Sequence, residues 1–289
     1  MIPYLWFENQ AHEAAAFYTD LFKNSAITGR MPMGEGPSGK MEVVTFDLMG
    51  LPYMAISAGP QFQITPAVSL FVYCESEAEI NRVYAALMEG GIAMMELDTY
   101  PWSPRYAWVQ DRFGVSWQLD VEAINNAQKI VPALMFANEN MSKVRDASAF
   151  YRGIFPNSVS LMEASYQEMT GSGGDDLIFA QVKLDGYIFN MMSNNEPHGF
   201  DFTEGFSFMV YCDDQAAIDH YWNSLSDGGE QQMCGWLKDR YGVSWQIIPR
   251  ALDRMMSDPD PDRRARVHEV ILRSRKLDLG ELEAAYNRG

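Results

Sequence analysis

An internal duplication limits the fold of this chain more than any other feature. The eight residues Asp111–Gln118 recur as Asp239–Gln246, and Phe113 is the one position that changes, to Tyr241. Other blocks recur in the same order: Ala16–Tyr18 as Ala149–Tyr151, Val72–Cys74 as Val210–Cys212, and Gly90–Gly91 as Gly228–Gly229. Repeated blocks in a fixed order predict two copies of one structural unit.

The spacing of these blocks predicts the domain organisation. We expect a first domain at residues 1–123, a second copy at 129–250 and a helical extension at 251–289. The extension has an apolar periodicity that is typical of helices, and its acidic residues balance its basic ones. It is therefore expected to cover a sheet edge or to mediate self-association, which makes a homodimer possible in addition to the internal pseudo-dimer.

Composition excludes several classes of function. The 289 residues include 22 Lys and Arg against 39 Asp and Glu, a net charge of −17, whereas nucleic-acid binding needs clustered basic side chains. No apolar run reaches the roughly 18 residues of a membrane span. The three cysteines show no metal-binding or disulfide spacing, as expected of reduced thiols. We predict a cytoplasmic protein that binds neither nucleic acid nor membrane.

In each half of the chain, the pattern of apolar and turn residues predicts two modules, each made of a strand, a helix and further strands. In the first half a Gly- and Pro-rich stretch, expected to be a loop with a hairpin turn at Gly34–Gly39, separates the helix from the next strands. The expected order is strand 2–7, helix 11–22, strands 42–48 and 53–57, strand 68–73, then helix 77–88. Such an α+β pattern predicts helices on one face of a curved, mostly antiparallel sheet in each half, with the other face concave.

Three motifs together resemble a known family. They are the helix end at Ala16–Phe22, the Val-Tyr-Cys strand followed by an acidic helix and Gly-Gly, and the closing segment Gly235–Pro249. This pattern is similar to the PhnB-like family, often labelled 3-demethylubiquinone-9 3-methyltransferase domain, of the vicinal oxygen chelate (glyoxalase/bleomycin resistance) superfamily. The resemblance covers both repeats. It implies two tandem domains, each a pair of βαβββ modules, and a ligand cleft on the concave sheet.

The resemblance also implies where a metal ion would bind. In metal-dependent members of the superfamily, four His, Glu or Gln side chains from the first and last strands hold the ion. The matching first-strand positions here lack ligand atoms: Pro3, Pro132, Val68 and Phe206. Only Gln118 and Gln246 remain, and a divalent site needs several converging ligands. We therefore predict no metal and no other cofactor.

Aromatic and amide side chains suggest the ligand site instead. Trp108 and Trp236 precede the two closing motifs at corresponding positions, and Gln118 and Gln246 lie inside them. Flat apolar walls with a few amide groups suit a small, partly aromatic molecule. We predict that these four residues bind such a ligand.

Neighbouring residues are expected to have structural roles. Strand alternation directs Trp117 and Trp245 away from the glutamines, toward the helices. Asp111 and Asp239 are expected to make turn or ion-pair contacts. Asp120 shares a strand face with Gln118 but corresponds to Ile248 in the second repeat, so we expect a surface charge at the strand end.

The leading hypothesis is a protein that binds a small organic ligand without a catalytic metal, and whether it is an enzyme stays open. One alternative is a metal-dependent lyase, isomerase or dioxygenase of the same superfamily. A third is a methyltransferase, as the family label suggests. The glycines of Gly34–Gly39 precede an expected strand and not a helix, which disfavours a nucleotide-binding loop.

Overall fold

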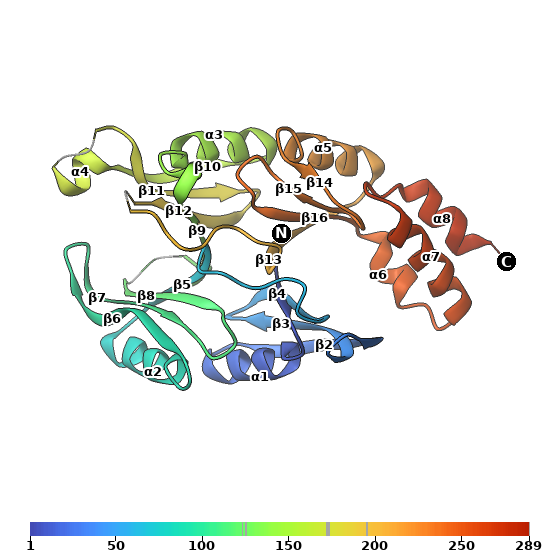
Figure 1. The fold of residues 1–289 in the computed structure, drawn as a ribbon, viewed down its shortest axis with the longest axis horizontal. Coiled ribbons are helices and arrows are strands. Elements are labelled where there is room, and N and C mark those ends of the chain that lie inside the picture. The colour runs from blue at the N-terminus through green and yellow to red at the C-terminus, as the bar shows by residue number, and fades with distance from the viewer. Residues whose placement is uncertain (123, 125, 172–173, 195, 289) are drawn as a thin grey trace. The chain divides into compact units, whose positions relative to one another are not determined.

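A computed structural model describes residues 1–122, 124, 126–171, 174–194 and 196–288 of the chain. The chain divides into two compact units, Pro3–Phe206 and a second one made of Met1–Ile2 with Ser207–Gly289. The domain boundary expected at residue 123 and the end of the extension at 289 lie outside the described residues. Figure 1 traces the fold of each unit.

Four βαβββ modules follow one another along the chain, as the sequence predicts. The first contains β1 (Ile2–Phe7), α1 (Ala11–Leu21), β2 (Ala26–Gly36), β3 (Gly39–Leu48) and β4 (Leu51–Ser57). The second contains β5 (Val68–Cys74), α2 (Glu77–Leu87), β6 (Ile92–Tyr100), β7 (Ser103–Gln110) and β8 (Ser116–Val121). The third contains β9 (Ile130–Phe136), η1 (Asn138–Asn140), α3 (Val144–Ile154), β10 (Val159–Ser165), α4 (Tyr166–Thr170), β11 (Leu177–Leu184) and β12 (Tyr187–Ser193). The fourth contains β13 (Phe206–Cys212), α5 (Gln215–Leu225), β14 (Glu230–Gln231), β15 (Trp236–Lys238) and β16 (Ser244–Pro249).

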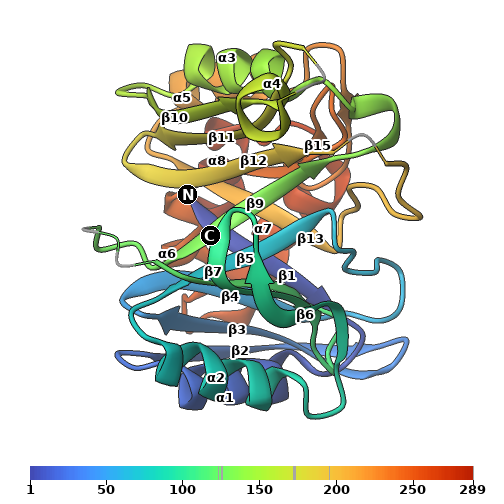
Figure 2. The ribbon, with the colours of Figure 1, turned by 90° about the vertical axis from the view of Figure 1, so that its left-hand side faces the viewer.

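One sheet of the Pro3–Phe206 unit joins modules from both repeats. Among the described residues it has eight strands, in the order β10-β11-β12-β9-β5-β8-β7-β6. Strands β5 and β9 pair antiparallel, with Phe71 opposite Val131. Helices α3 and α2 cover its outer face over the two modules (Figure 2). The modules are thus as predicted, but this sheet joins the second and third modules, whereas we expected each sheet to lie within one repeat.

Burial explains why β5 and β9 pair. Every residue of both strands is buried, so unpaired backbone N–H and C=O groups along either edge would be costly. Strand β5 pairs with β8 on one side, and β9 pairs with β12. Pairing β5 with β9 therefore satisfies the remaining edge of each strand.

Strands β1, β4, β3 and β2 follow each other in the first module, and β2 corrects a prediction. The stretch from Ala26 to Gly36, expected to be a loop, is a strand that pairs with β3 through two register shifts. It is mostly exposed, which explains why its sequence lacks the apolar alternation of a half-buried strand. Edge strands and bulges tolerate Pro32 and the glycines. The turn after Gly36 is the predicted hairpin.

Local sequence signals fix the helix of the second module. Ser76 Oγ accepts the backbone N–H of Glu79 at 3.2 Å and caps α2. The helix buries Ile80, Val83 and Leu87. Gly91 follows its end, and a Cβ there would lie 2.4 Å from the carbonyl oxygen of Leu87, so only glycine fits.

The recurring closing motif builds a turn beneath the helices. Asp111 accepts the backbone N–H groups of Phe113 and Val115 at 2.9 and 3.0 Å. It also accepts the indole N–H of Trp117 and the phenol O–H of Tyr18 on α1. The predicted structural role of Asp111 is therefore confirmed, and Trp117 faces the helix side of the sheet.

The C-terminal extension folds onto the second unit. It consists of α6 (Ala251–Met256), α7 (Pro261–Arg273) and α8 (Leu279–Asn287). Backbone N–H groups of Cys234 and Gly235 donate to the carbonyls of Ser274 and Arg275 at 2.7 and 2.8 Å. The helices enclose their own apolar cluster: Leu252, Met255, Val267, Val270, Leu277, Leu282, Ala285 and Tyr286.

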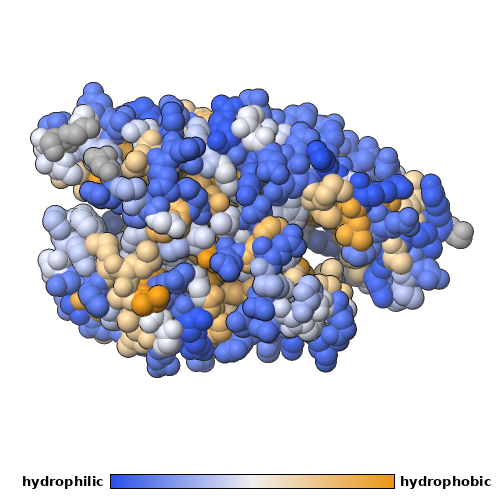
Figure 3. All heavy atoms as spheres, in the orientation of Figure 1, coloured by the Kyte–Doolittle hydropathy of each residue, from blue (hydrophilic) through white to orange (hydrophobic). Residues whose placement is uncertain are grey.

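Polar residues dominate the face drawn in Figure 3. No helix in the described ranges is long and apolar enough to span a membrane.

Candidate functional site

The sheet that runs from β10 to β6 has a concave inner face. The amide Nε2 of Gln118 on β8 lies 3.4 Å from Sδ of Met192 on β12, although β5 and β9 separate these strands. Three strand spacings of a flat sheet measure roughly 14 Å, so the sheet must curve strongly. We call the buried side chains on this face the inner-face cluster: Phe71, Tyr73, Tyr106, Trp108, Val131, Ala133, Met135, Ala137 and Ile188.

The phenol of Tyr73 links the two modules across this face. Gln181 Nε2 and Asn190 Nδ2 donate to its oxygen at 3.0 and 3.1 Å, and Gln181 also donates to Asn190 Oδ1 at 2.9 Å. Burial raises the pKa of Tyr73 to about 12, so the phenol is protonated at neutral pH. Its O–H meets no acceptor within hydrogen-bond distance among the described residues, and a buried donor of this kind is available to a ligand.

The structure brings Trp108 and Gln118 together, as the sequence predicts. They lie directly opposite each other on β7 and β8. Gln118 Oε1 accepts the O–H of Tyr106 at 2.8 Å, and the indole N–H of Trp108 donates to Ser116 Oγ at 2.8 Å. Both aromatic side chains belong to the inner-face cluster.

The second predicted pair has the same strand geometry inside its own unit. Trp236 and Gln246 lie opposite each other on β15 and β16. Gln246 Nε2 donates to Ser207 Oγ at 2.9 Å. The contacts at the end of this face differ from those at the corresponding place in the first repeat. Ile248, which corresponds to Asp120, packs against the apolar cluster of the extension, and Tyr211 donates to Asp253 of α6 at 2.9 Å.

Asp120 corrects a prediction. We expected a surface charge at the strand end, but the residue is only 9% exposed and shares the inner face with Gln118. It lies opposite Tyr106 on β7 and beside Tyr73 on β5. The apolar strands around it bury a position that the sequence places near a strand end.

Sequence reasoning missed Tyr73, Gln181 and Asn190 because it looked for His, Glu or Gln only at the metal-ligand positions of the superfamily. Asn190 is fully buried within β12, whose other residues are mostly apolar. An amide inside such a strand was the signal that could have identified it. The segment after β12 was missed as well: His198 stacks on Phe200 with a centroid distance of 4.7 Å, and both rings approach Trp108.

The inner face does not fit a divalent metal. The first-strand positions assumed for ligands, Pro132 and Val68, alternate with the cluster residues Val131 and Phe71 and so face outward. The polar side chains that the described contacts place on this face are the amides of Gln118, Gln181 and Asn190, the phenols of Tyr73 and Tyr106, and the carboxylate of Asp120. In the part of the chain that the structure describes, no three His, Cys, Asp or Glu side chains converge. A catalytic divalent site needs more anionic or imidazole ligands.

The chain does not fit S-adenosylmethionine in the usual way either. Gly36 and Gly39 flank a turn between two antiparallel strands, β2 and β3, and Gly34 lies within β2. The dinucleotide-type loop instead runs from a strand into a helix N-terminus.

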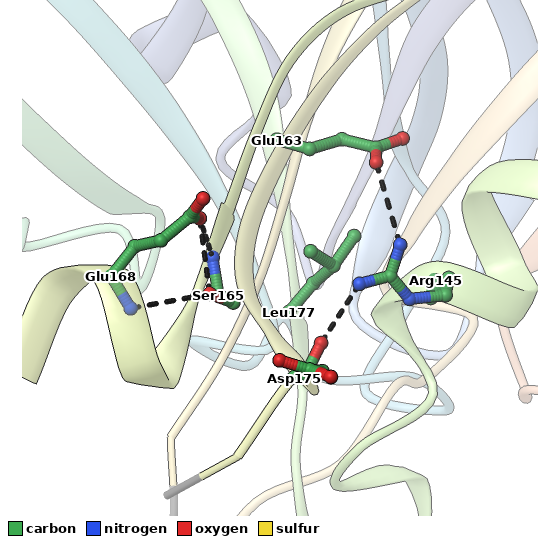
Figure 4. A pocket seen from close by; sticks show the side chains of 6 residues that line it. All are labelled: Arg145, Glu163, Ser165, Glu168, Asp175 and Leu177. Atoms are coloured by element: carbon green, nitrogen blue, oxygen red, sulfur yellow. Dashed lines mark hydrogen bonds and ion pairs between the residues drawn. The ribbon is translucent and has the colours of Figure 1, made fainter. Parts of the chain in front are cut away.

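A polar pocket of about 520 Å³ lies beside α3 and α4 (Figure 4). Its one base contacts its neighbours: Arg145 pairs with Glu163 at 3.6 Å and donates to the backbone carbonyl of Asp175 at 2.8 Å. Glu168 and Ser165 form the capping box of α4. These contacts stabilise the local fold.

Paired βαβββ modules around concave sheets define a protein with the vicinal oxygen chelate fold. The family model described as 3-demethylubiquinone-9 3-methyltransferase matches residues 1–120 and 128–248. The chain therefore belongs to this PhnB-like family, in a tandem form.

Several solved structures are similar to this chain. A PhnB protein of Bacillus cereus, described as a candidate 3-demethylubiquinone-9 3-methyltransferase, is 38% identical over 42% of this chain and 98% of its own, with a TM-score of 0.40. Glyoxalase I of Zea mays matches 88% of this chain and 94% of its own at 10% identity and a TM-score of 0.56. A candidate dioxygenase of Bacillus subtilis matches 98% of this chain and 94% of its own, at 11% identity and a TM-score of 0.51. The last two show the fold alone. A search of curated proteins finds no match.

Proposed function

We propose that the inner face of the β10–β6 sheet binds a small, partly aromatic organic molecule without a catalytic metal. One observation carries this proposal: the face combines an aromatic cluster with three amide side chains, those of Gln118, Gln181 and Asn190. Aromatic walls supply apolar contact area, and a few fixed polar groups orient a ligand.

The ligand must displace contacts that the side chains now make with each other. Tyr73 receives hydrogen bonds from Gln181 and Asn190, and these donors are placed to turn toward a ligand. Exposed Trp102, stacked on Tyr100 at 5.2 Å, adds an aromatic surface at the rim. We also predict a second site at Trp236 and Gln246. The extension covers the end of that site at Ile248.

A titration tests the proposal. Purified protein is titrated with 2-naphthalenemethanol and followed by calorimetry and by tryptophan fluorescence, and we expect saturable binding in the micromolar range. In parallel, Zn, Ni, Mn and Fe are added in thermal-shift assays, and none is expected to raise Tm. Stoichiometric metal after purification, or a large metal-induced rise in Tm, would replace the proposal by a metal-dependent lyase, isomerase or dioxygenase.

The methyltransferase alternative has its own test. Calorimetry with S-adenosylmethionine is expected to show no binding below millimolar concentrations. Tight binding of that compound would instead support the activity in the family description.

A further inference from the structure

Asp120 is a carboxylate placed between two tyrosines on the inner face. Its register partners are Tyr106 on β7 and Tyr73 on β5. Strand alternation keeps it on the same face as Gln118, and only 9% of the residue is exposed.

No cation balances this carboxylate in the described part of the chain. One oxygen accepts the O–H of Ser103, and the contacts of Asp120 include no ion pair. Two basic residues, one just before β9 and one on β7, are engaged elsewhere, since Lys129 pairs with Glu75 at 3.5 Å and Arg105 donates to Asn81 at 2.9 Å. Burial raises the pKa of Asp120, as expected when a charged group leaves water without a counter-ion.

Aromatic rings gather beside the carboxylate. Tyr100 and Trp102 contact Tyr106 edge-on, with centroid distances of 5.7 and 5.8 Å. Rings of this kind attract a cation through their faces, and a carboxylate at their edge adds a charged hydrogen-bond acceptor.

The fold itself does not require a charge at this position. The corresponding residue of the second repeat is Ile248, which sits beside Tyr211 in the same strand register and packs against the apolar extension. An apolar residue therefore satisfies the same place in the module. A buried, uncompensated carboxylate is retained in the first repeat at a cost in folding free energy.

We propose, building on the function proposed above, that the ligand is an aromatic amine in its protonated form. Its ammonium group binds the carboxylate of Asp120, and its ring packs against Tyr100, Trp102 and Tyr106. The amides of Gln118 and Asn190 remain for polar groups elsewhere on the ligand.

Three probes of nearly equal shape test this. Wild-type protein is titrated by calorimetry at pH 7.5 with 2-naphthylmethylamine, which is a cation, with neutral 2-naphthalenemethanol and with anionic 2-naphthoate. We expect the amine to bind at least about ten-fold more tightly than the alcohol, because both can donate a hydrogen bond to the carboxylate but only the ammonium adds the attraction of an opposite charge. The naphthoate is expected to bind more weakly than the alcohol.

Two variants with the same change in net charge locate the effect. Asp120→Asn keeps the shape of the side chain and is expected to abolish the preference for the amine, so that the ratio of amine affinity to alcohol affinity falls to about one. Glu122→Gln, an exposed acid two residues away, is expected to retain the preference. Thermal melts verify that both variants fold.

The outcomes separate this inference from the function on which it rests. Equal affinities for amine and alcohol would overturn the cation proposal and leave aromatic ligand binding intact. Loss of the preference in Glu122→Gln as large as in Asp120→Asn would also overturn it, because the general negative field would then be the cause. If no naphthalene probe binds, both proposals fail.

Discussion

Asp111 accepts the indole N–H of Trp117 at 2.8 Å, and Asp239 accepts that of Trp245 at the same distance in the second repeat. In both copies the carboxylate also accepts two backbone N–H groups of the turn between them. The recurring motif is thus a buried turn that ties the last strand of a module to the helix side of its sheet.

Replacing Asp111 should destabilise the protein strongly. Asp111→Ala leaves the N–H groups of Trp117, Phe113 and Val115 buried without an acceptor, so we expect a loss of roughly 3 kcal/mol or more in the free energy of unfolding. Urea denaturation measures this. Asp20→Ala, which removes an exposed acid on α1, serves as the control and should change stability by less than about 0.5 kcal/mol. Equal effects of the two changes would contradict the role of the turn.

The stability contribution of Asp120 should depend on pH. Burial raises the pKa of Asp120, so ionising this carboxyl group destabilises the folded state. Below the ordinary carboxylate pKa, about 3.9, the group is protonated and this cost is absent. The cost develops as the pH rises through the raised pKa of the folded state. Asp120→Asn cannot ionise, so its Tm should exceed that of wild type at pH 7.5. The difference should shrink toward zero near pH 3.5. Differential scanning calorimetry across this range checks the sign, and a pH-independent difference would refute it.

Matched glutamine variants distinguish the two repeats. Gln118→Leu removes the amide that contacts Tyr106 and Met192, and we expect about ten-fold weaker binding of 2-naphthalenemethanol. Gln246→Leu should change the affinity of the first-repeat site by less than about two-fold, and that site should take one ligand per chain. Calorimetry gives both quantities. A stoichiometry of two would show that the Trp236–Gln246 pair binds as well.

The three thiols should differ in reactivity. Burial raises the pKa of both Cys74 and Cys212 to about 12, so their thiolate forms are scarce at pH 8. Half-buried Cys234 is more accessible. Ellman's reagent should therefore modify one thiol per native chain quickly, and Cys234→Ser should remove that phase. Rapid modification of all three thiols without denaturant would contradict the described burial.

Much of the architecture could be predicted from local patterns. The duplicated motifs gave the two repeats, and apolar periodicity located α2 and β5 to within about one residue. Alternation along β8 placed Trp117 toward the helices and Gln118 on the inner face. Strand β2 could not be found this way, because an exposed edge strand lacks the apolar alternation that marks a buried one.

The candidate site was predictable only in part. Trp108 and Gln118 follow from the motif and its strand register. Tyr73 and Asn190 are 117 residues apart, and their contact depends on which modules share a sheet. The sequence pattern of Asp120 indicates a strand end and gives no measure of how deeply the neighbouring strands bury it.

The sequence alone therefore determined the four modules, their internal order and the faces of their strands, because those features depend on residues close together in the chain. The tertiary structure decided that β5 pairs with β9, that the extension covers Ile248, and that Asp120 lies buried among tyrosines. The physical reason is that any apolar strand edge offers the same backbone donors and acceptors. Only the packing of the whole unit selects which edge is paired and which side chains then meet.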